Sequence, residues 1–186
     1  MLTQSAEKIA SIIERNLNYS KTIHVEPPLL SVGIEKNKSL GKRGTTGTRL
    51  IPLTVSCANP CITPEKFLGL EFAEAAIIRN AGGRARPALS SLLTLDSLGN
   101  TGTIVMIHHT DCGMSHYSES EFQDRSKAKH PDIDLYGEEF GAIVDPEETV
   151  MEDVEYLKSF ESWGKANVEI VGLVLDTFSG VVKRVV

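Results

Sequence analysis

The segment TIVMIH at residues 103–108, followed directly by HTDCG at residues 109–113, decides the fold. A short and nearly continuous apolar run is typical of a strand buried on both faces of a parallel sheet. Similar runs predict further strands at residues 52–56, 75–79 and 168–176, and helical patterns alternate with them at residues 64–72, 86–98 and 146–160. This alternation predicts an α/β fold in which helices flank a central, mostly parallel β-sheet.

The flanking segments complete the predicted domain. Apolar residues recur at helical spacing between residues 3 and 19 and predict an amphipathic N-terminal helix. Residues 26–50 are rich in Gly and Lys, lack periodicity and contain no phosphate-binding pattern, so they predict a loop. Residues 181–186 predict a closing edge strand. For 186 residues we therefore expect a single domain, with a helical arm at 1–25, a loop at 26–50 and an α/β core at 51–186.

Composition and charge narrow the functional classes. Hydrophobic residues make up 41% and charged residues 24% of the chain, which is ordinary for a globular protein. The net charge of −6 disfavours nucleic acid and anionic membranes as partners. No apolar run is long enough to span a bilayer, and the N-terminus does not resemble an export or transit signal. We expect a cytoplasmic protein that acts on a small molecule and binds neither nucleic acid nor membrane.

The chemistry is concentrated at two strand ends. Cys57 ends the first predicted strand, while His109 and Cys112 follow the third. Because the carboxyl ends of parallel strands share one edge of a sheet, these residues are expected to meet there. Cysteine and histidine are ligands that zinc prefers, and three protein ligands leave an open position, as in catalytic sites. The alternative is that they are two buried thiols and a core histidine.

Several motifs resemble the β-carbonic anhydrase family in order and spacing. They are SCANPCITPEKFLGL at 56–70, IRNAGGR at 78–84, HHTDCGM at 108–114, DPEE at 145–148 and VGLVLD at 171–176. The resemblance covers residues 51–186. It implies a zinc enzyme that hydrates carbon dioxide to bicarbonate and works as a dimer built around a parallel sheet. It also implies that Cys57, His109 and Cys112 are the zinc ligands.

The segment after Cys57 departs from the family pattern. The family carries Cys-x-Asp-x-Arg there, whereas this chain has Asn59 and Cys61 at the Asp and Arg positions. In the family the aspartate accepts a hydrogen bond from the zinc-bound hydroxide, and the arginine holds the aspartate. Asn59 still offers a carbonyl acceptor but is neutral and cannot take up a proton. We therefore expect weak or absent ordinary carbon dioxide hydration.

Cys61 allows three interpretations. As a fourth ligand it would complete a closed Cys₃His structural site, in which no water is activated. As a small apolar side chain it would only fill the space of the missing arginine. As a thiolate beside zinc it would be a nucleophile or redox group.

Neighbouring residues have candidate supporting roles. Asp111, between two predicted ligands, is a candidate for orienting them or for bonding the turn amides. His116 is a candidate proton relay, with an ordinary surface histidine as the alternative. His108 should face away from His109 and serve packing. Gly82-Gly83 would allow a close backbone approach. Arg79, Arg84 and Arg86 are candidates for anion attraction or for pairing at a subunit contact.

Together the residues and the resemblance lead to two functional hypotheses. The first is a zinc-dependent lyase or hydrolase that adds zinc-bound hydroxide to carbon dioxide or a related small electrophile. The second is an inactive zinc-binding scaffold or regulatory homologue in which Cys61 closes the metal site. In either case the apolar stripe of the N-terminal helix predicts a homodimer or a higher homo-oligomer.

Overall fold

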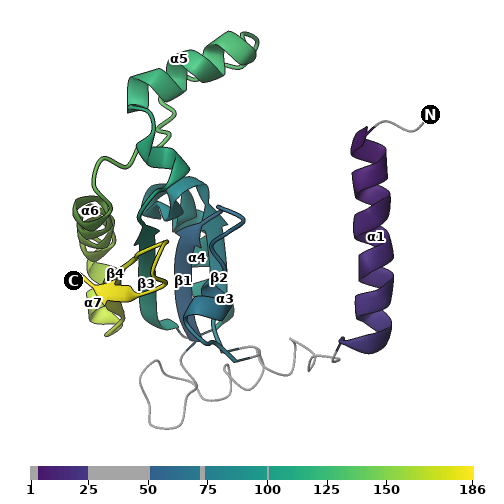
Figure 1. Cartoon of the computed structure of the whole chain (residues 1–186). Coiled ribbons are helices and arrows are strands. Elements are labelled where there is room, and N and C mark those ends of the chain that lie inside the picture. Colours follow the sequence, from purple (N-terminus) through teal and green to yellow (C-terminus); the bar gives the residue numbers. More distant parts are fainter. Residues whose placement is uncertain (1–3, 25–50, 72–73, 100) are drawn as a thin grey trace. The chain divides into compact units, whose positions relative to one another are not determined.

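The computed structural model describes residues 4–24, 51–71, 74–99 and 101–186 (Figure 1). The chain divides into two compact units, Met1–Lys36 and Asn37–Val186, which are described separately. The predicted loop at 26–50 lies outside the described residues, and the single-domain organisation stays a prediction.

In the first unit the structure describes one helix, α1 (Gln4–Thr22), as the apolar periodicity predicted. Its apolar stripe contains Ile9, Ile12, Ile13 and Leu17, and each of these side chains is more than half exposed. Within the described ranges no helix is long and apolar enough to cross a bilayer.

The second unit is built on a five-stranded sheet in the order β2-β1-β3-β4-β5 (Figure 1). The strands are β1 (Ile51–Cys57), β2 (Ala76–Asn80), β3 (Thr101–His109), β4 (Glu169–Leu175) and β5 (Val182–Arg184). The first four are parallel, whereas β5 is antiparallel to β4. The predicted α/β fold with a mostly parallel sheet is confirmed. The neighbouring parallel strands β1 and β3 place their carboxyl ends beside each other.

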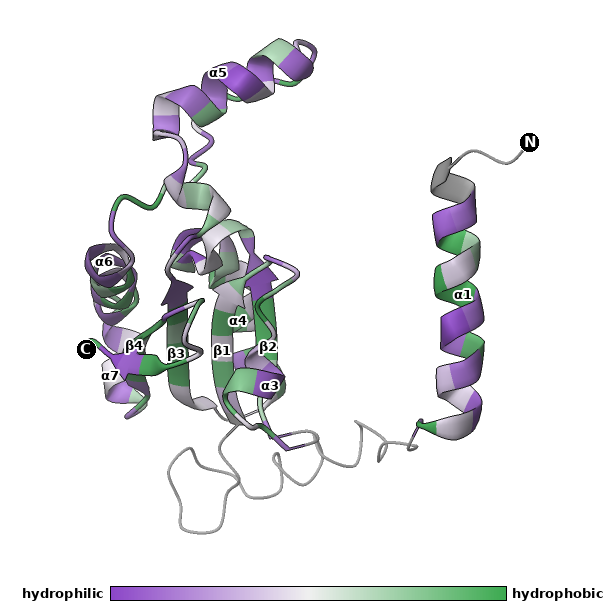
Figure 2. Cartoon of the chain, in the orientation of Figure 1, coloured by the Kyte–Doolittle hydropathy of each residue, from purple (hydrophilic) through white to green (hydrophobic). Residues whose placement is uncertain are grey.

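Helices connect and cover the strands. They are α3 (Pro64–Phe67), α4 (Ala85–Leu98), α5 (Glu119–Lys129), α6 (Pro146–Lys158) and α7 (Glu161–Lys165), with short 3₁₀ turns η1 (Ala81–Gly83) and η2 (Gly113–Ser115). Apolar side chains of β1 and β3, such as Val55 and Met106, pack with Leu92 of α4 and Val154 of α6 in one buried core. Figure 2 shows this contrast, with hydrophobic central strands and a hydrophilic α5.

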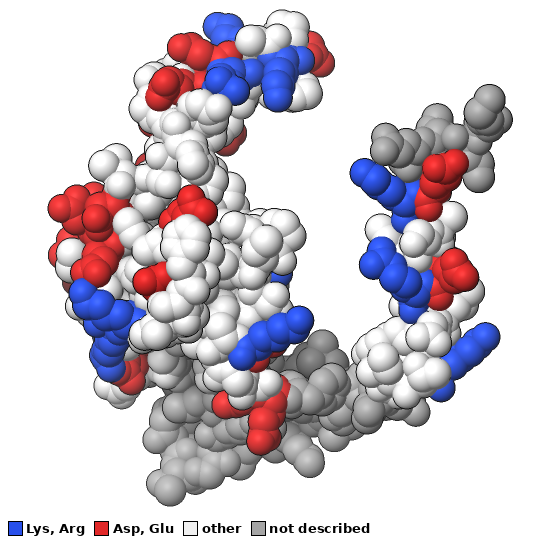
Figure 3. Space-filling view, viewed as in Figure 1, with Lys and Arg blue, Asp and Glu red and all other residues white. Residues whose placement is uncertain are grey.

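Two helix predictions need correction. The helix expected at 64–72 ends at Phe67, because Gly69 takes a left-handed conformation with φ 62°. Thr63 occupies the N-cap position there, but its side chain makes no capping hydrogen bond. Helix α5 was not predicted, since it buries no residue and carries charges of both signs (Figure 3). A reciprocal capping box between Ser118 and Glu121 fixes its start instead.

Candidate metal centre

The structure brings together the three residues that the sequence placed at the strand ends. Cys57 is the last residue of β1, His109 is the last of β3, and Cys112 follows after a short turn. Their possible ligand atoms lie within 4.8 Å of one another, and all three residues are buried. The two Sγ atoms are 3.8 Å apart. The turn places Asp111 in the left-handed region with φ 52°, a conformation that aspartate tolerates better than most residues.

The hydrogen bonds of His109 determine which ring nitrogen is free. Nδ1 lies 2.8 Å from the carbonyl oxygen of Thr110 and 3.1 Å from Oγ1 of Thr177. A carbonyl oxygen only accepts, so Nδ1 carries the proton and donates it. Nε2 therefore presents a lone pair, yet it is buried and has no hydrogen-bond partner. A buried nitrogen without a partner is costly, and a metal ion bound to Nε2 would remove that cost.

The two thiols share one proton in this arrangement. The Sγ–Sγ contact lowers the pKa of Cys57, where the backbone N–H groups of Asn59 and Gly82 also favour the thiolate. The same contact, followed by burial, raises the pKa of Cys112. Burial alone would lower the pKa of His109, but the neighbouring Cys57 and the Thr110 carbonyl raise it overall. The arrangement thus favours a thiolate, the form that binds a metal, at Cys57 and a protonated thiol at Cys112.

The donor set suits zinc. Two thiolates and one imidazole are ligands that zinc takes in tetrahedral sites, and two thiolate charges balance the charge of the ion. The Nδ1–H donation of His109 to Thr110 is the kind of contact that orients zinc-binding histidines. The unpartnered Nε2, the paired sulfurs and the oriented ring therefore fit zinc as the cofactor.

Close packing of a glycine turn shapes one wall of the centre. Gly83 has φ 73°, and a Cβ atom there would lie 2.8 Å from the carbonyl oxygen of Ile107 and 3.0 Å from the backbone nitrogen of Cys57. Only glycine fits between the ends of β1 and β3 at this point. The close approach expected for Gly82-Gly83 is confirmed.

Comparisons with known proteins point to one family. No protein-family model matches the chain. Over 70 residues it is 34% identical to β-carbonic anhydrase 1 of Mycobacterium tuberculosis, which covers 37% of this chain and 43% of that protein. The structure of carbonic anhydrase from Streptococcus mutans matches 100% of both chains with a TM-score of 0.77 and 27% identity. In sequence and in structure the chain is thus similar to β-carbonic anhydrases.

The match to the curated β-carbonic anhydrases spans less than half of their length. A further structural neighbour is a carbon disulfide hydrolase, with a TM-score of 0.63 and 20% identity over 95% of this chain and 89% of that one. At this identity the likeness concerns the fold.

The positions of the family's Asp and Arg lie just outside the metal-binding group. Asn59 is half-buried, and its Oδ1 accepts a hydrogen bond from the backbone N–H of Cys61 at 2.9 Å. Cys61 is a free and exposed thiol. It is not part of the group of ligand atoms that the described residues bring together.

Arg79 has a role that sequence reasoning missed. Its Nε donates to the carbonyl oxygen of Cys57 at 3.0 Å, and a terminal nitrogen donates to the carbonyls of Asn59 and Ile62 at 2.6 and 2.5 Å. The sequence suggests anion attraction or a subunit contact for this side chain. The guanidinium instead holds the segment of residues 58–62, hereafter the 58–62 loop. Arg79 faces Ser56 across the strand pair, and only this register could have signalled the contact.

The other candidate residues lie at or behind the centre. Asp111 and His116 are both exposed, and His116 Nε2 lies 4.0 Å from Asp111 Oδ1. His108 is fully buried behind the centre, as its packing role predicted, with Nδ1 3.1 Å from Thr149 Oγ1 and Nε2 3.1 Å from Asp153 Oδ2. Asp153 also accepts a hydrogen bond from Nε of Arg84 at 2.9 Å. Sequence reasoning missed this pairing, because 69 positions separate the partners.

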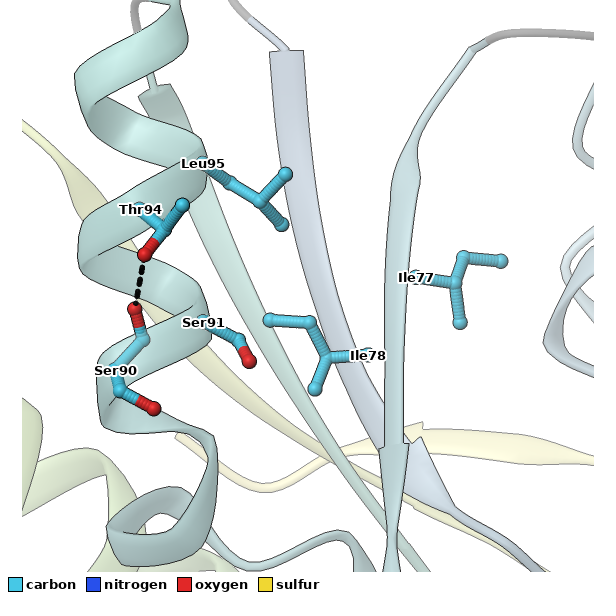
Figure 4. Close-up of a pocket in the computed structure, with 6 residues that line it drawn as sticks. All are labelled: Ile77, Ile78, Ser90, Ser91, Thr94 and Leu95. Carbon is cyan, nitrogen blue, oxygen red and sulfur yellow. Dashed lines mark hydrogen bonds between the residues drawn. The ribbon is translucent and has the colours of Figure 1, made fainter.

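One hollow in the described part of the surface lacks the side chains that a reaction site needs. It measures about 400 Å³ and lies between α4 and the edge strand β2 (Figure 4). It is lined by Ile77, Ile78, Ser90, Ser91, Thr94 and Leu95. None of these side chains is an acid, a base or a metal ligand. The metal-ligating side chains of the described residues lie instead at the strand ends.

Proposed function

We propose that this chain is a zinc-dependent lyase of the carbonic anhydrase type, with Cys57, His109 and Cys112 as the zinc ligands. The observation that carries the proposal is the buried Nε2 of His109, which has no partner and lies within 4.8 Å of the sulfur ligand atoms. Bound zinc would supply a Lewis acid that activates water for attack on a small electrophilic carbon. Carbon dioxide is the proposed substrate, and related linear molecules such as carbonyl sulfide or carbon disulfide are the neighbouring choices.

The residues around the ligands would accept hydrogen bonds near the centre and carry protons to solvent. Asn59 offers a carbonyl acceptor near the centre, but this oxygen already accepts the N–H of Cys61 and cannot take up a proton. The Asp111 and His116 side chains provide a route for protons to solvent, because both are exposed and lie within 4.0 Å of each other. Loss of the acidic residue at position 59 should make ordinary carbon dioxide hydration weak.

Stopped-flow carbon dioxide hydration tests this proposal. The natural chain should be slow, and the double variant Asn59→Asp/Cys61→Arg, which restores the family pattern, should be at least tenfold faster because a positioned acid–base group contributes about 10²–10⁴ in rate. Cys61→Ser alone serves as the matched control, since it removes the thiol without adding the pair. A natural chain with no zinc, or a double variant with no hydration despite bound zinc, would contradict the proposed lyase. A fast natural chain would contradict only the expected weak rate.

The alternative is a scaffold in which Cys61 closes the metal site. It requires the Cys61 thiol, which is exposed and lies outside the group of ligand atoms, to turn inward. Cobalt substitution distinguishes the two. Charge-transfer bands that weaken by one thiolate in Cys61→Ser would favour the scaffold, and unchanged bands would favour the open catalytic site.

The homodimer proposal depends on α1. A helix with Ile9, Ile12, Ile13 and Leu17 exposed along one side leaves a large apolar stripe in water. Packing of this stripe against a second copy would bury it. Light scattering should give a dimer or a multiple of it for the full chain, and Ile9→Glu/Ile13→Glu should lower the mass; a monomeric natural chain would contradict the proposal.

A further inference from the structure

The segment of residues 140–143 is held from two sides. From helix α5, the Glu119 carboxylate accepts the backbone N–H groups of Phe140, Gly141 and Ala142 at 2.6, 3.0 and 3.2 Å. From the start of α4, a terminal nitrogen of Arg84 donates to the carbonyl oxygen of Ala142 at 3.1 Å. One side chain thus satisfies three of the backbone donors of this segment, and another satisfies an acceptor.

Backbone packing fixes the segment further. Gly141 has φ 75°, and a Cβ atom there would lie 2.9 Å from Cγ of Arg84, so the segment lies directly on the Arg84 side chain. Arg84 is itself anchored, because its Nε donates to the buried Asp153 at 2.9 Å. Substantial movement of the 140–143 segment would therefore require breaking charge-assisted hydrogen bonds.

The last residue of this segment reaches the metal-binding group. Ile143 is 1% exposed and packs with Cys57 and Cys112 in one buried cluster. Its N–H donates to the carbonyl oxygen of Met114 at 3.0 Å, and its Cδ1 would lie 3.1 Å from a Cβ atom at Gly82. The Ile143 side chain thus forms an apolar wall beside the two cysteines, and Met114 packs against the same cluster.

We propose that Glu119 and Arg84 form a two-sided clamp that keeps Ile143 closed over the Cys57–Cys112 pair and so limits the access of small molecules to the centre. Both are positioning residues, since they act through the 140–143 segment. The proposal goes beyond the lyase activity, and it rests on the proposed function only in treating the Cys–His–Cys group as the centre that is reached.

The test measures access to the two buried thiols in a Cys61→Ser background, where the exposed thiol no longer reacts. A chromogenic disulfide reagent reports modification of Cys57 and Cys112, and a chromogenic chelator reports zinc loss from the same purified protein. Glu119→Gln and Arg84→Lys should raise both rates by about tenfold or more, because hydrogen bonds to charged groups contribute at least that factor. Asp124→Asn, which removes an exposed carboxylate from the same helix, should leave both rates within twofold.

The two measurements distinguish failure of the clamp from failure of the proposed zinc lyase. Protein without zinc but with clamp-dependent thiol modification would contradict the zinc lyase and support the clamp. Zinc-bound protein with unchanged rates in Glu119→Gln would overturn the clamp alone. If Glu119→Gln does not fold, Ile143→Ala tests the wall directly, and an unchanged thiol rate in that variant overturns the proposal. The increase should persist at urea concentrations well below the unfolding transition with little urea dependence, as expected for a local opening.

Discussion

The metal-binding group and the 58–62 loop are adjacent in the chain but are held in different ways. The ligands are buried at two strand ends, and the atoms that they offer to a metal belong to their side chains. The loop is held through its carbonyl groups, which accept hydrogen bonds from Arg79. Carbonyl groups are present whatever the side chain, so the hydrogen bonds from Arg79 do not depend on which side chains stand at positions 59 and 61. This difference explains how the chain keeps a complete donor set while it lacks the family's Asp and Arg.

The largest effect is expected from a variant that removes a ligand of the metal-binding group and leaves the 58–62 loop unchanged. Cys57→Ser replaces a thiolate with a hydroxyl, which is a poor zinc ligand, and should weaken zinc binding by more than about a hundredfold, the upper range for losing a mere supporting contact. Cys61→Ser makes the same replacement of sulfur by oxygen, but in the 58–62 loop. This variant should still bind one zinc ion per chain. Metal analysis and chelator competition measure both, and equal zinc loss in the two variants would make Cys61 a ligand.

The next effect concerns the support behind the group. Asp153 is 3% exposed and accepts from both Arg84 and His108, the neighbour of His109. Asp153→Asn leaves the Arg84 cation without its buried partner, which should lower the free energy of unfolding by about 3 kcal/mol. Glu152→Gln is the matched control, because Glu152 is 67% exposed and 3.8 Å from Arg84, so its loss should cost less than about 1 kcal/mol.

Urea unfolding of the two variants under identical conditions measures this difference. Equal destabilisation by Asp153→Asn and Glu152→Gln would contradict the importance of the buried contact. Zinc should be present at the same level in all samples, since bound metal itself stabilises the folded state.

A smaller effect is expected when the contacts that hold the 58–62 loop are weakened. Arg79→Lys keeps the positive charge but loses the planar fork that reaches the Cys57, Asn59 and Ile62 carbonyls. It should cost about 1–2 kcal/mol of stability and speed amide exchange within the loop. The zinc content should stay unchanged, because none of the three ligand side chains is altered. Loss of zinc in Arg79→Lys would show that the loop and the group are not separable.

The sequence predicted the group better than its surroundings, for physical reasons. Buried strands such as 103–108 leave an apolar run, and strand ends in a parallel sheet converge, so the meeting of Cys57, His109 and Cys112 was predictable. The orientation of Asn59 toward the Cys61 N–H was not, since loop hydrogen bonds leave no periodic signal. Helix α5 escaped prediction because its hydrophilic sequence has no apolar face.

Contacts between residues far apart in the sequence could not be predicted either. The Glu119 carboxylate meets backbone groups 21 to 23 positions away, and backbone donors have no residue identity to read. The same holds for Arg79 and its three carbonyl acceptors. The supports of this site act largely through the main chain, and for this reason a reading of side chains alone found the ligands and missed what holds them.

The smallest expected effect is a pH dependence at Glu119. Burial would raise the pKa of this carboxyl, but the three backbone N–H donors outweigh burial and lower it below the ordinary value of 4.5. A carboxylate whose pKa is lowered by folding contributes stability above the pKa of the unfolded chain, and this contribution disappears as the pH falls through the folded pKa. Glu119→Gln should therefore be less stable than the natural chain at pH 7, by about 1 kcal/mol.

The difference between the two proteins should shrink steadily as the pH falls below about 4.5, because the protonated natural side chain resembles the amide. Urea unfolding at a series of pH values measures it, and Asp124→Asn should show no such convergence. A constant difference between the natural chain and Glu119→Gln from pH 7 to pH 3 would mean that the amide disrupts packing and not charge. The ionised carboxylate would then not be what holds the 140–143 segment, and the wall beside the two sulfurs would depend on Arg84 alone.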